Sequence, residues 1–251
     1  MNNITRIKQF TAALLIMGSF SPALYAAPVK EDVPNVQNRS ETLSERQQAI
    51  PLIASYMATS NMAKLNTALN QGLDAGLTVN ETKEILVQLY AYTGFPRSLN
   101  ALNELMKVVE ERKQRGINDV QGKEPVTPVP VGEELRRLGT ANQTKISGAP
   151  VQGPLFDFAP VINQFLQTHL FGDIFARDNL DWQSRELATV GALAATPGVE
   201  AQLLSHLRAS QRVGLSGGQL RQLAQLLREN GETDAGKRVE SALQQALSDK
   251  K

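Results

Sequence analysis

The amino-acid sequence predicts an all-α protein. Leucine, alanine and glutamine are frequent among its 251 residues, and aromatic residues make up only 5% of them, a composition that favours helices. Neither half of the chain shows a convincing β-strand pattern. Apolar residues instead recur at the spacing of an amphipathic helix, most clearly near the C-terminus, at Val239, Ala242, Leu243, Ala246 and Leu247.

The N-terminus has the three parts of a secretory signal. Two basic side chains precede a short apolar core at residues 10–20, and small residues follow around Ala26. We therefore expect residues 1–26 to be a signal peptide, cleaved near Ala26, and the mature protein to be exported to the periplasm. The apolar core is too short to span a bilayer comfortably, so we expect no stable membrane span after cleavage.

Charge and cysteine content exclude several classes of function. The 26 basic and 25 acidic residues leave a net charge of +1, so we expect no nucleic-acid partner. The chain has no cysteine, which excludes disulfide bonds, thiol redox chemistry and a cysteine nucleophile. Two histidines far apart in the sequence make a poor ligand set, so we expect no metal site.

Residues 41–115 are predicted to form a first helical block. Ile85 and Leu89 belong to an apolar stripe with helical spacing, and Gly94 in the following Gly-Phe-Pro turn should end that helix. The next helix is expected to start near Ser98. These features predict a series of short, punctuated helices.

The amino-acid composition changes between the first helical block and the second. Residues 116–154 are dense in proline and glycine, and within them only residues 133–138 have a helical pattern. We therefore predict a long linker there. Residues 155–251 are predicted to form the second block.

The two blocks share a short pattern of helix, Gly-Leu, Ser or Thr, and helix. It occurs in AGLTVNETKEIL and in VGLSGGQLRQLA, where Gly76 and Gly214 lie 138 residues apart (214 minus 76). Both glycines are predicted to end a helix, and Thr78 and Ser216 to cap the next one. The pattern indicates an internal repeat, although such punctuation is also common in unrelated helical proteins.

Glu186 and His206 are the candidate acid/base pair. Glu186 shares an apolar stripe with Val190 and Leu193, so its carboxylate would either be desolvated or need a close partner. A short turn separates its helix from that of His206, and two antiparallel helices could bring the side chains together. The alternative is structural: a carboxylate is favoured in the first turn of any helix, and a single histidine beside an apolar stripe usually serves packing.

The segment YAYTGFPRSLNAL is a candidate wall of a binding pocket. Tyr90, Tyr92, Arg97 and Asn100 offer aromatic and polar groups to an anionic substrate. Alternatively, the aromatic rings belong to the core and the turn merely separates two helices. Arg185, adjacent to the candidate glutamate but about 100° away around the helix, could hold a substrate carboxylate or serve structure.

Two segments resemble the carboxymuconolactone decarboxylase family. In FLQTHLFGDIFARDNLDWQSRELATVGALAA (residues 165–195), an aromatic-Gly-acidic-Ile-aromatic element precedes an arginine, a Leu-Asp pair and Arg-Glu-Leu. LLSHLRASQRVGLS (residues 203–216) adds the histidine helix and Gly-Leu-Ser. GLTVNETKEILVQLYAYTGFPRSLNAL is similar to the family's other half. The chain thus resembles two fused domains of this family, one in each helical block.

The resemblance implies an all-α fold that assembles into homo-oligomeric rings, commonly trimers or hexamers. One branch of the family is a lyase that decarboxylates a cyclic lactone acid without a cofactor. The alkyl hydroperoxidase D branch uses a Cys-x-x-Cys pair, which this chain lacks. We therefore expect cofactor-free proton transfer on a small lactone or keto acid. His206 would deliver or take the proton, and Glu186 would orient it.

The 138-residue offset predicts that the two blocks are not equivalent. It aligns Glu186 with Gln48 and His206 with Ala68, so the first block lacks both ionisable groups. We therefore expect one composite site per chain, completed by the Tyr90–Asn100 wall of the same or a neighbouring chain. The competing hypothesis is an exported binding or scaffold protein without catalysis, because an exported location is unusual for a catabolic decarboxylase.

Overall fold

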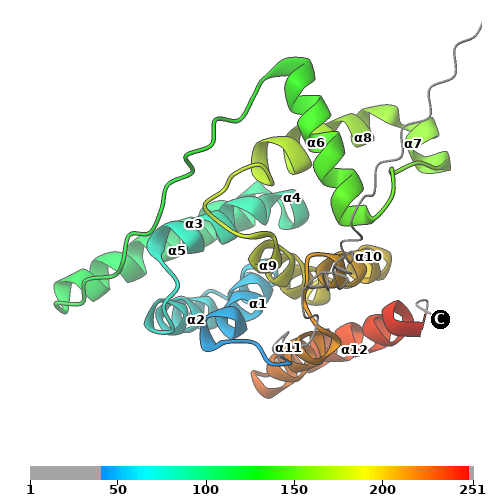
Figure 1. Ribbon diagram of the computed structural model, residues 1–251. Helices are drawn as coiled ribbons and strands as arrows, with labels where there is room; N and C mark the ends of the chain where they lie inside the picture. Colours follow the sequence, from blue (N-terminus) through cyan, green and yellow to red (C-terminus); the bar gives the residue numbers. More distant parts are fainter. Residues whose placement is uncertain (1–40, 249–251) are drawn as a thin grey trace, which may run out of the picture. The chain divides into compact units, whose positions relative to one another are not determined.

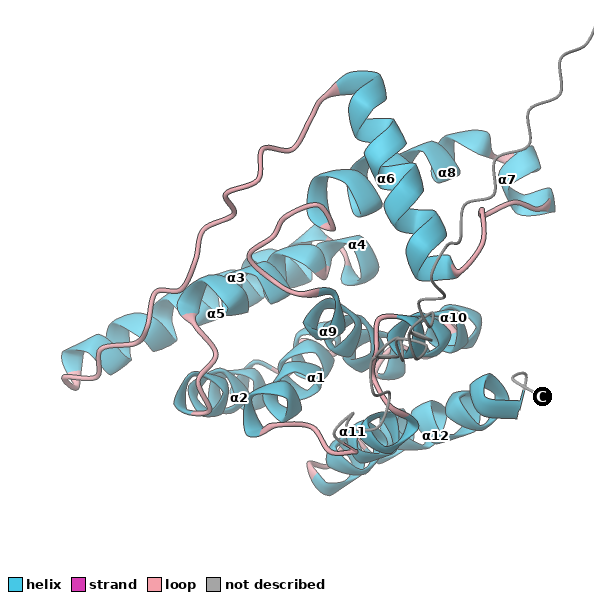
Figure 2. Cartoon of the chain, in the orientation of Figure 1, coloured by secondary structure: helices cyan, strands magenta, loops and turns pink. Residues whose placement is uncertain are grey.

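The computed structural model describes residues 41–248, which contain helices and loops only (Figures 1 and 2). The all-α class is thereby confirmed for these residues. The predicted signal peptide at residues 1–26 lies outside the described range. Between residues 41 and 248, no helix is long and apolar enough to cross a membrane.

The first part of the described chain is a series of closely spaced helices. They are α1 (Glu45–Ala58), α2 (Met62–Asp74), α3 (Val79–Gln88), α4 (Tyr90–Thr93) and α5 (Phe95–Gln114). Thr78 caps α3 as predicted, in a reciprocal capping box with Glu81. The final helix of this part begins earlier than the predicted Ser98, because Pro96 is tolerated in a first helical turn.

The middle of the chain is more helical than its composition suggests. It contains α6 (Gly132–Ser147), α7 (Pro154–Phe158), α8 (Pro160–Phe165) and the π-helix η1 (Leu166–Ile174). The predicted linker is therefore corrected: only residues 117–131 are a helix-free connection before α6. Tertiary packing explains the difference. A side chain at Gly139 would meet the Gln167 carbonyl of η1, so this glycine lets α6 lie directly against η1.

The last part consists of α9 (Trp182–Ala194), α10 (Glu200–Arg212), α11 (Gly217–Glu229) and α12 (Thr233–Ser248). Ser216 caps α11 as predicted. The helices α10, α11 and α12 each begin 138 residues after α2, α3 and α5 (200 minus 62, 217 minus 79, 233 minus 95).

The offset changes upstream of α10. Helix α9 begins 137 residues after α1 (182 minus 45), because the stretch from α9 to α10 is one residue longer than that from α1 to α2. The counterpart of Glu186 is therefore Ala49 rather than the predicted Gln48 (186 minus 137). Ala49 also lacks an ionisable group, so the predicted difference between the two blocks is unchanged.

Both blocks contribute to one hydrophobic core. Helices α1 and α9 pack against each other at its centre, with α2 and α10 beside them (Figure 1). Their backbones approach closely because Gly191 has no side chain: a Cβ atom there would lie 2.5 Å from the Pro51 carbonyl oxygen and 2.7 Å from its Cα.

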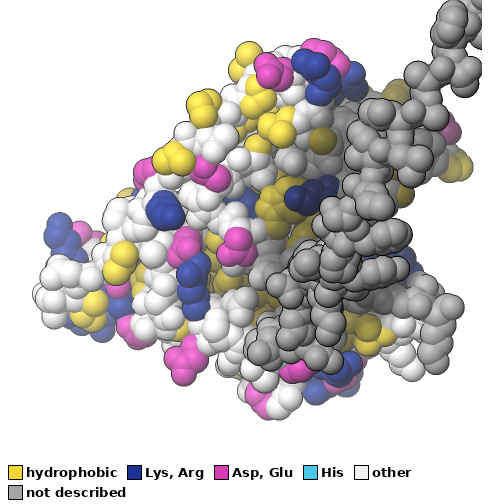
Figure 3. Space-filling model, in the orientation of Figure 1, with side chains coloured by type: hydrophobic (Ala, Val, Ile, Leu, Met, Phe, Trp, Pro, Cys, Tyr) yellow, Lys and Arg dark blue, Asp and Glu magenta, His cyan; other side chains and the backbone are white. Residues whose placement is uncertain are grey.

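A second, smaller cluster covers the outer side of α10. Its buried residues come from α6, from η1 and its C-terminal end, and from α10, and Tyr90 and Tyr92 of α4 pack against it. On the face shown in Figure 3, acidic and basic side chains are interspersed, as expected from the small net charge. The second cluster therefore encloses the part of α10 that carries His206.

Replacing Gly191 with alanine should destabilise the protein. The added methyl group would meet main-chain atoms of Pro51, which cannot rotate away, so α1 and α9 must separate. We expect the free energy of unfolding to fall by about 1–3 kcal/mol in urea denaturation. Gly217→Ala is the control, because its nearest neighbour is a flexible arginine side chain at 3.5 Å. Equal stability of the two variants would contradict the close packing.

Candidate functional site

Glu186 and His206 are in direct contact in the structure. The His206 Nδ1 lies 2.9 Å from Glu186 Oε2. The Glu186 side chain is completely buried on α9, whereas His206, on α10, keeps 16% of its side chain exposed. The pair thus joins a desolvated carboxylate to an imidazole that solvent or a ligand can reach.

The helix dipole does not account for the position of Glu186. Asp181 is the N-cap of α9 and accepts a 2.8 Å hydrogen bond from the Ser184 backbone N–H. Glu186 is the fifth residue of the helix, beyond the first turn in which the dipole acts. Its Oε1 has no hydrogen-bond partner among the described residues. A buried carboxylate with an unsatisfied oxygen is costly, which favours a functional reason for its presence.

Tyr92 completes a three-residue cluster with this pair. Its ring stands edge-on to His206, with ring centroids 5.3 Å apart and planes at 82°. Burial raises the pKa of the Tyr92 hydroxyl well above its ordinary value, and the nearby Glu186 charge raises it further. The hydroxyl is buried, and the nearby Thr189 side chain opposes part of this rise. Tyr92 is therefore a neutral group beside the carboxylate. We call Glu186, His206 and Tyr92 the acid–base cluster.

Arg185 is committed to a buried ion-pair network. Its Nη2 donates to Glu84 Oε1 of α3 at 3.0 Å, and its Nη1 donates to Gln88 Oε1 at 3.0 Å. Glu84 also accepts two 2.9 Å hydrogen bonds from Arg177 Nε. Burial lowers the pKa of the Arg185 guanidinium, and the Glu84 carboxylate opposes that shift. This position fits the structural alternative for Arg185 rather than a contact with substrate.

The other predicted wall residues lie away from His206. Tyr90 stacks on Phe95, with centroids 4.2 Å apart, and its ring lies 5.6 Å from that of His169. Arg97 is exposed, and its Nη1 donates to the Thr93 carbonyl at 2.9 Å. Asn100 is also exposed on α5. The structure therefore brings only Tyr92 of the predicted wall to the Glu186–His206 pair.

His206 lines a cavity of about 290 Å³ formed by α6, η1, α10 and the loop after α6. Sequence analysis missed the two arginines of its lining, Arg208 and Arg212. The sequence does carry a signal for them: the α10 residues of the lining have the spacing of one helix face. The sequence did not predict that α6 covers this helix face, because α6 lies in the segment that was predicted to be a linker. The α10 residues are Ser205, His206, Arg208, Ala209 and Arg212.

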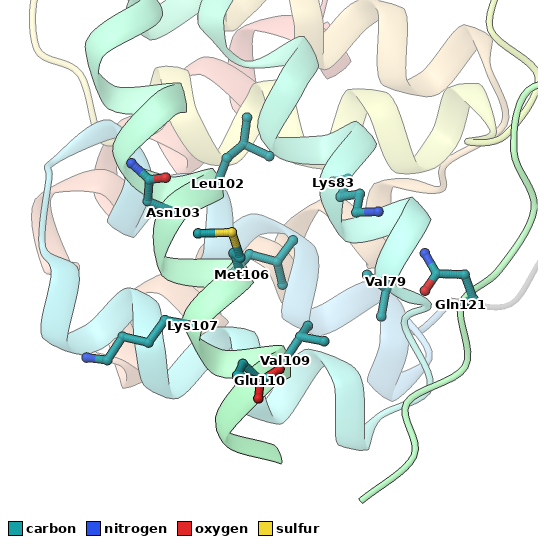
Figure 4. Close-up of a pocket in the computed structure, with 10 residues that line it drawn as sticks. Val79, Lys83, Leu102, Asn103, Met106, Lys107, Val109, Glu110 and Gln121 are labelled. Carbon is teal, nitrogen blue, oxygen red and sulfur yellow. The ribbon is translucent and has the colours of Figure 1, made fainter. Parts of the chain in front are cut away.

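A larger groove of about 870 Å³ lies between α3, α5 and the connection after α5 (Figure 4). Apolar side chains such as Leu102, Met106 and Val109 form part of it, with Lys83 and Gln121 beside them. Its described lining contains Lys83 and Glu110 but no histidine. In residues 41–248, no three His, Cys, Asp or Glu side chains are grouped so that they could hold a metal ion.

No protein-family model matches the chain, and no curated protein sequence is significantly similar to it.

Breaking the buried ion pair between Arg185 and Glu84 should be strongly destabilising. Glu84→Gln leaves the Arg185 charge buried without its carboxylate, so we expect the free energy of unfolding to fall by about 3–5 kcal/mol. Arg136→Gln, which removes the exposed ion pair with Glu133, is the control and should have no measurable effect. Urea denaturation measures both, and equal losses would contradict the assignment.

Because the pKa of Tyr92 is raised in the folded protein, the free energy of unfolding should depend on pH in the alkaline range. The folded pKa of Tyr92 is raised, so its contribution is complete below the ordinary tyrosine pKa and is lost as the pH rises above about 10 and the unfolded chain ionises. We expect the free energy of unfolding between pH 8 and 11 to fall less steeply in Tyr92→Phe than in the wild type. Parallel pH profiles would show that the hydroxyl is not desolvated.

Proposed function

We propose that this chain is a carboxymuconolactone decarboxylase-like protein that moves a proton to or from a small lactone or keto acid without a cofactor. One observation carries the proposal: His206 contacts a fully buried carboxylate through Nδ1 and also lines a cavity. This arrangement gives an imidazole a fixed orientation, a nearby negative charge and access to a ligand.

The contact with Glu186 determines which nitrogen acts. A carboxylate accepts hydrogen bonds, so the proton of neutral His206 resides on Nδ1 and Nε2 is the proton acceptor. Among residues 41–248 no hydrogen bond occupies Nε2. The buried carboxylate also stabilises the imidazolium that forms when Nε2 takes a proton, as the aspartate does in a catalytic triad.

In the decarboxylation, protonated His206 acts as the acid. The carbon–carboxylate bond breaks, carbon dioxide leaves, and the electron pair is delocalised into the conjugated carbonyl of the substrate. The carbon then takes the Nε2 proton and its electron pair forms the new C–H bond. His206 becomes neutral and regains a proton from solvent. With a keto acid that keeps its carboxylate, neutral His206 would instead remove a proton beside the carbonyl.

We propose further that residues 41–115 and 155–251 are two repeats of this family. The matching starts of α2, α3 and α5 with α10, α11 and α12 support this. A cavity of about 360 Å³ is lined by Ala68, the counterpart of His206 (206 minus 138). Ala49 stands in the place of Glu186. Only the second repeat therefore carries the acid–base pair, which supports one site per chain.

Tyr92 makes the proposed site composite within a single chain. It lies on α4, which has no separate counterpart: the equivalent residues 228–231 (90 plus 138 to 93 plus 138) are the end of α11 and the turn that follows it. The first repeat thus contributes Tyr92, and the second contributes Glu186 and His206.

Export and oligomerisation are part of the same proposal. The family resemblance implies a homo-oligomer, a trimer or a hexamer, and the predicted signal peptide at residues 1–26 implies export to the periplasm. Exposed apolar side chains on α7 and α8 support an interface, since Leu155, Phe158 and Phe165 are 63%, 89% and 58% exposed.

A binding protein without catalysis is the second candidate. The observation that favours it is the 870 Å³ groove, which offers apolar surface and whose described lining includes neither Glu186 nor His206. In that case the Glu186–His206 contact would serve structure alone.

His206→Asn and Glu186→Gln should lower turnover by about 10²- to 10⁴-fold, the usual contribution of a positioned acid/base group. A panel of lactone acids and keto acids would be assayed for carbon dioxide release and for uptake of solvent deuterium. His169→Gln is the matched control, because that histidine is exposed and paired with Asp173. Wild-type turnover in His206→Asn would overturn the mechanism. A panel without turnover or exchange in the wild type would favour the binding protein.

A further inference from the structure

We infer that the ligand of the His206 cavity carries a carboxylate and that Arg212 binds it. The inference rests on the proposed function, since it names the substrate class of the same site. The sequence suggested Arg97 or Arg185 as the residue that binds the substrate carboxylate. We assign this role instead to Arg212, which lines the cavity. Arg212 is thus a specificity-determining residue.

Arg212 is held in place by the end of α6. Its Nη1 donates to the Ile146 carbonyl at 3.4 Å, where the negative end of the helix dipole favours a cation. Gly148 makes room for it: this glycine has a φ of 82°, and a Cβ atom there would lie 2.5 Å from Arg212 Nε. Arg212 is an exposed residue, and these contacts place its guanidinium against the end of α6.

The guanidinium retains donors for a ligand. The bond to Ile146 is its one hydrogen bond among the described residues, and an arginine carries five N–H donors. Two of them match the oxygens of a carboxylate in a fork-like geometry. Arg208 also lines the cavity but already has an interaction partner, so Arg212 is the guanidinium assigned to the ligand.

The lining of the cavity fits an anion with an apolar body. Among the described residues of its lining, the charged members are Arg208 and Arg212, which are both basic. Ile146, Val151 and Phe171 provide apolar surface. His206 and Arg212 are six residues apart, about 9 Å along the helix axis. One end of the ligand therefore meets the guanidinium while another part lies against His206.

The first repeat provides an independent comparison. The counterpart of Arg212 is Asp74 (212 minus 138), which pairs with Arg112 at 2.8 Å. The repeat with a histidine thus has a cation at this position, and the repeat with Ala68 has an anion. The histidine and the cation thus occur together in the second repeat, and neither is present at the equivalent positions of the first, which supports a shared role.

The test is a titration of the protein with dicarboxylates, followed by the NMR signals of the His206 ring. His169→Gln serves as the background because the chain has two histidines. Malonate, succinate and glutarate are the probes, and dimethyl succinate is the uncharged comparison. We expect at least one dicarboxylate to shift the His206 signals saturably, and the diester to leave them unchanged.

Arg212→Gln should raise the dissociation constant at least about 10-fold, the effect of losing a charged hydrogen bond, and Arg212→Lys should raise it less. Arg221→Gln, with the same change of charge on α11, should bind as the parent does. Circular dichroism would verify that each variant is folded. No saturable shift with any probe, equal binding of the diester, or unchanged binding by Arg212→Gln would each overturn the inference.

The two proposals can fail separately. If Arg212→Gln binds dicarboxylates normally while His206→Asn loses turnover, the proton-transfer function stands and the role of Arg212 falls. If binding requires Arg212 but His206→Asn retains turnover, the cavity is a carboxylate site and the proposed mechanism falls.

Discussion

The buried ion pair between Arg185 and Glu84 is the constraint on which the candidate site depends. It fastens the start of α9 to α3, deep in a core where unpaired charge is costly. Glu186 follows Arg185 directly on α9, and α3 leads into α4, which carries Tyr92. The same contact therefore fixes both the carboxylate and the tyrosine beside His206. Hydrogen bonds from Arg177 to the Glu84 carboxylate help to offset the cost of burying it.

The two halves of the described chain share a framework but differ in chemistry. Helices with matching starts build both, and α1 and α9 meet at the centre where Gly191 permits close approach. Packing can be preserved while ionisable groups are confined to one half, because alanine fits the same helix positions without needing a partner. Such a division places the energetic cost of burying the Glu186 carboxylate in the second half alone.

The segment between the halves turns a helix face into a cavity. Without α6 and η1, the outer side of α10 would be open to water, and a charge near His206 would be strongly screened. Gly139 brings α6 against η1, and Gly148 lets the end of α6 meet Arg212. Small residues in this segment thus determine what surrounds the imidazole.

The sequence by itself determined the helical class, the N-caps at Thr78 and Ser216, and the glycine stops at Gly76 and Gly214, with φ of 94° and 108°. These features depend on neighbours within a few residues, so local patterns reveal them. The spacing of the apolar residues Val190 and Leu193 also predicted that the Glu186 carboxylate would be desolvated or would need a close partner. Only the tertiary structure decided that Tyr92 lies beside Glu186 and His206, that Arg185 pairs with Glu84, and that α6 forms within the expected linker. Each of these depends on contacts between distant segments, whose energies outweigh local propensity and cannot be read from spacing.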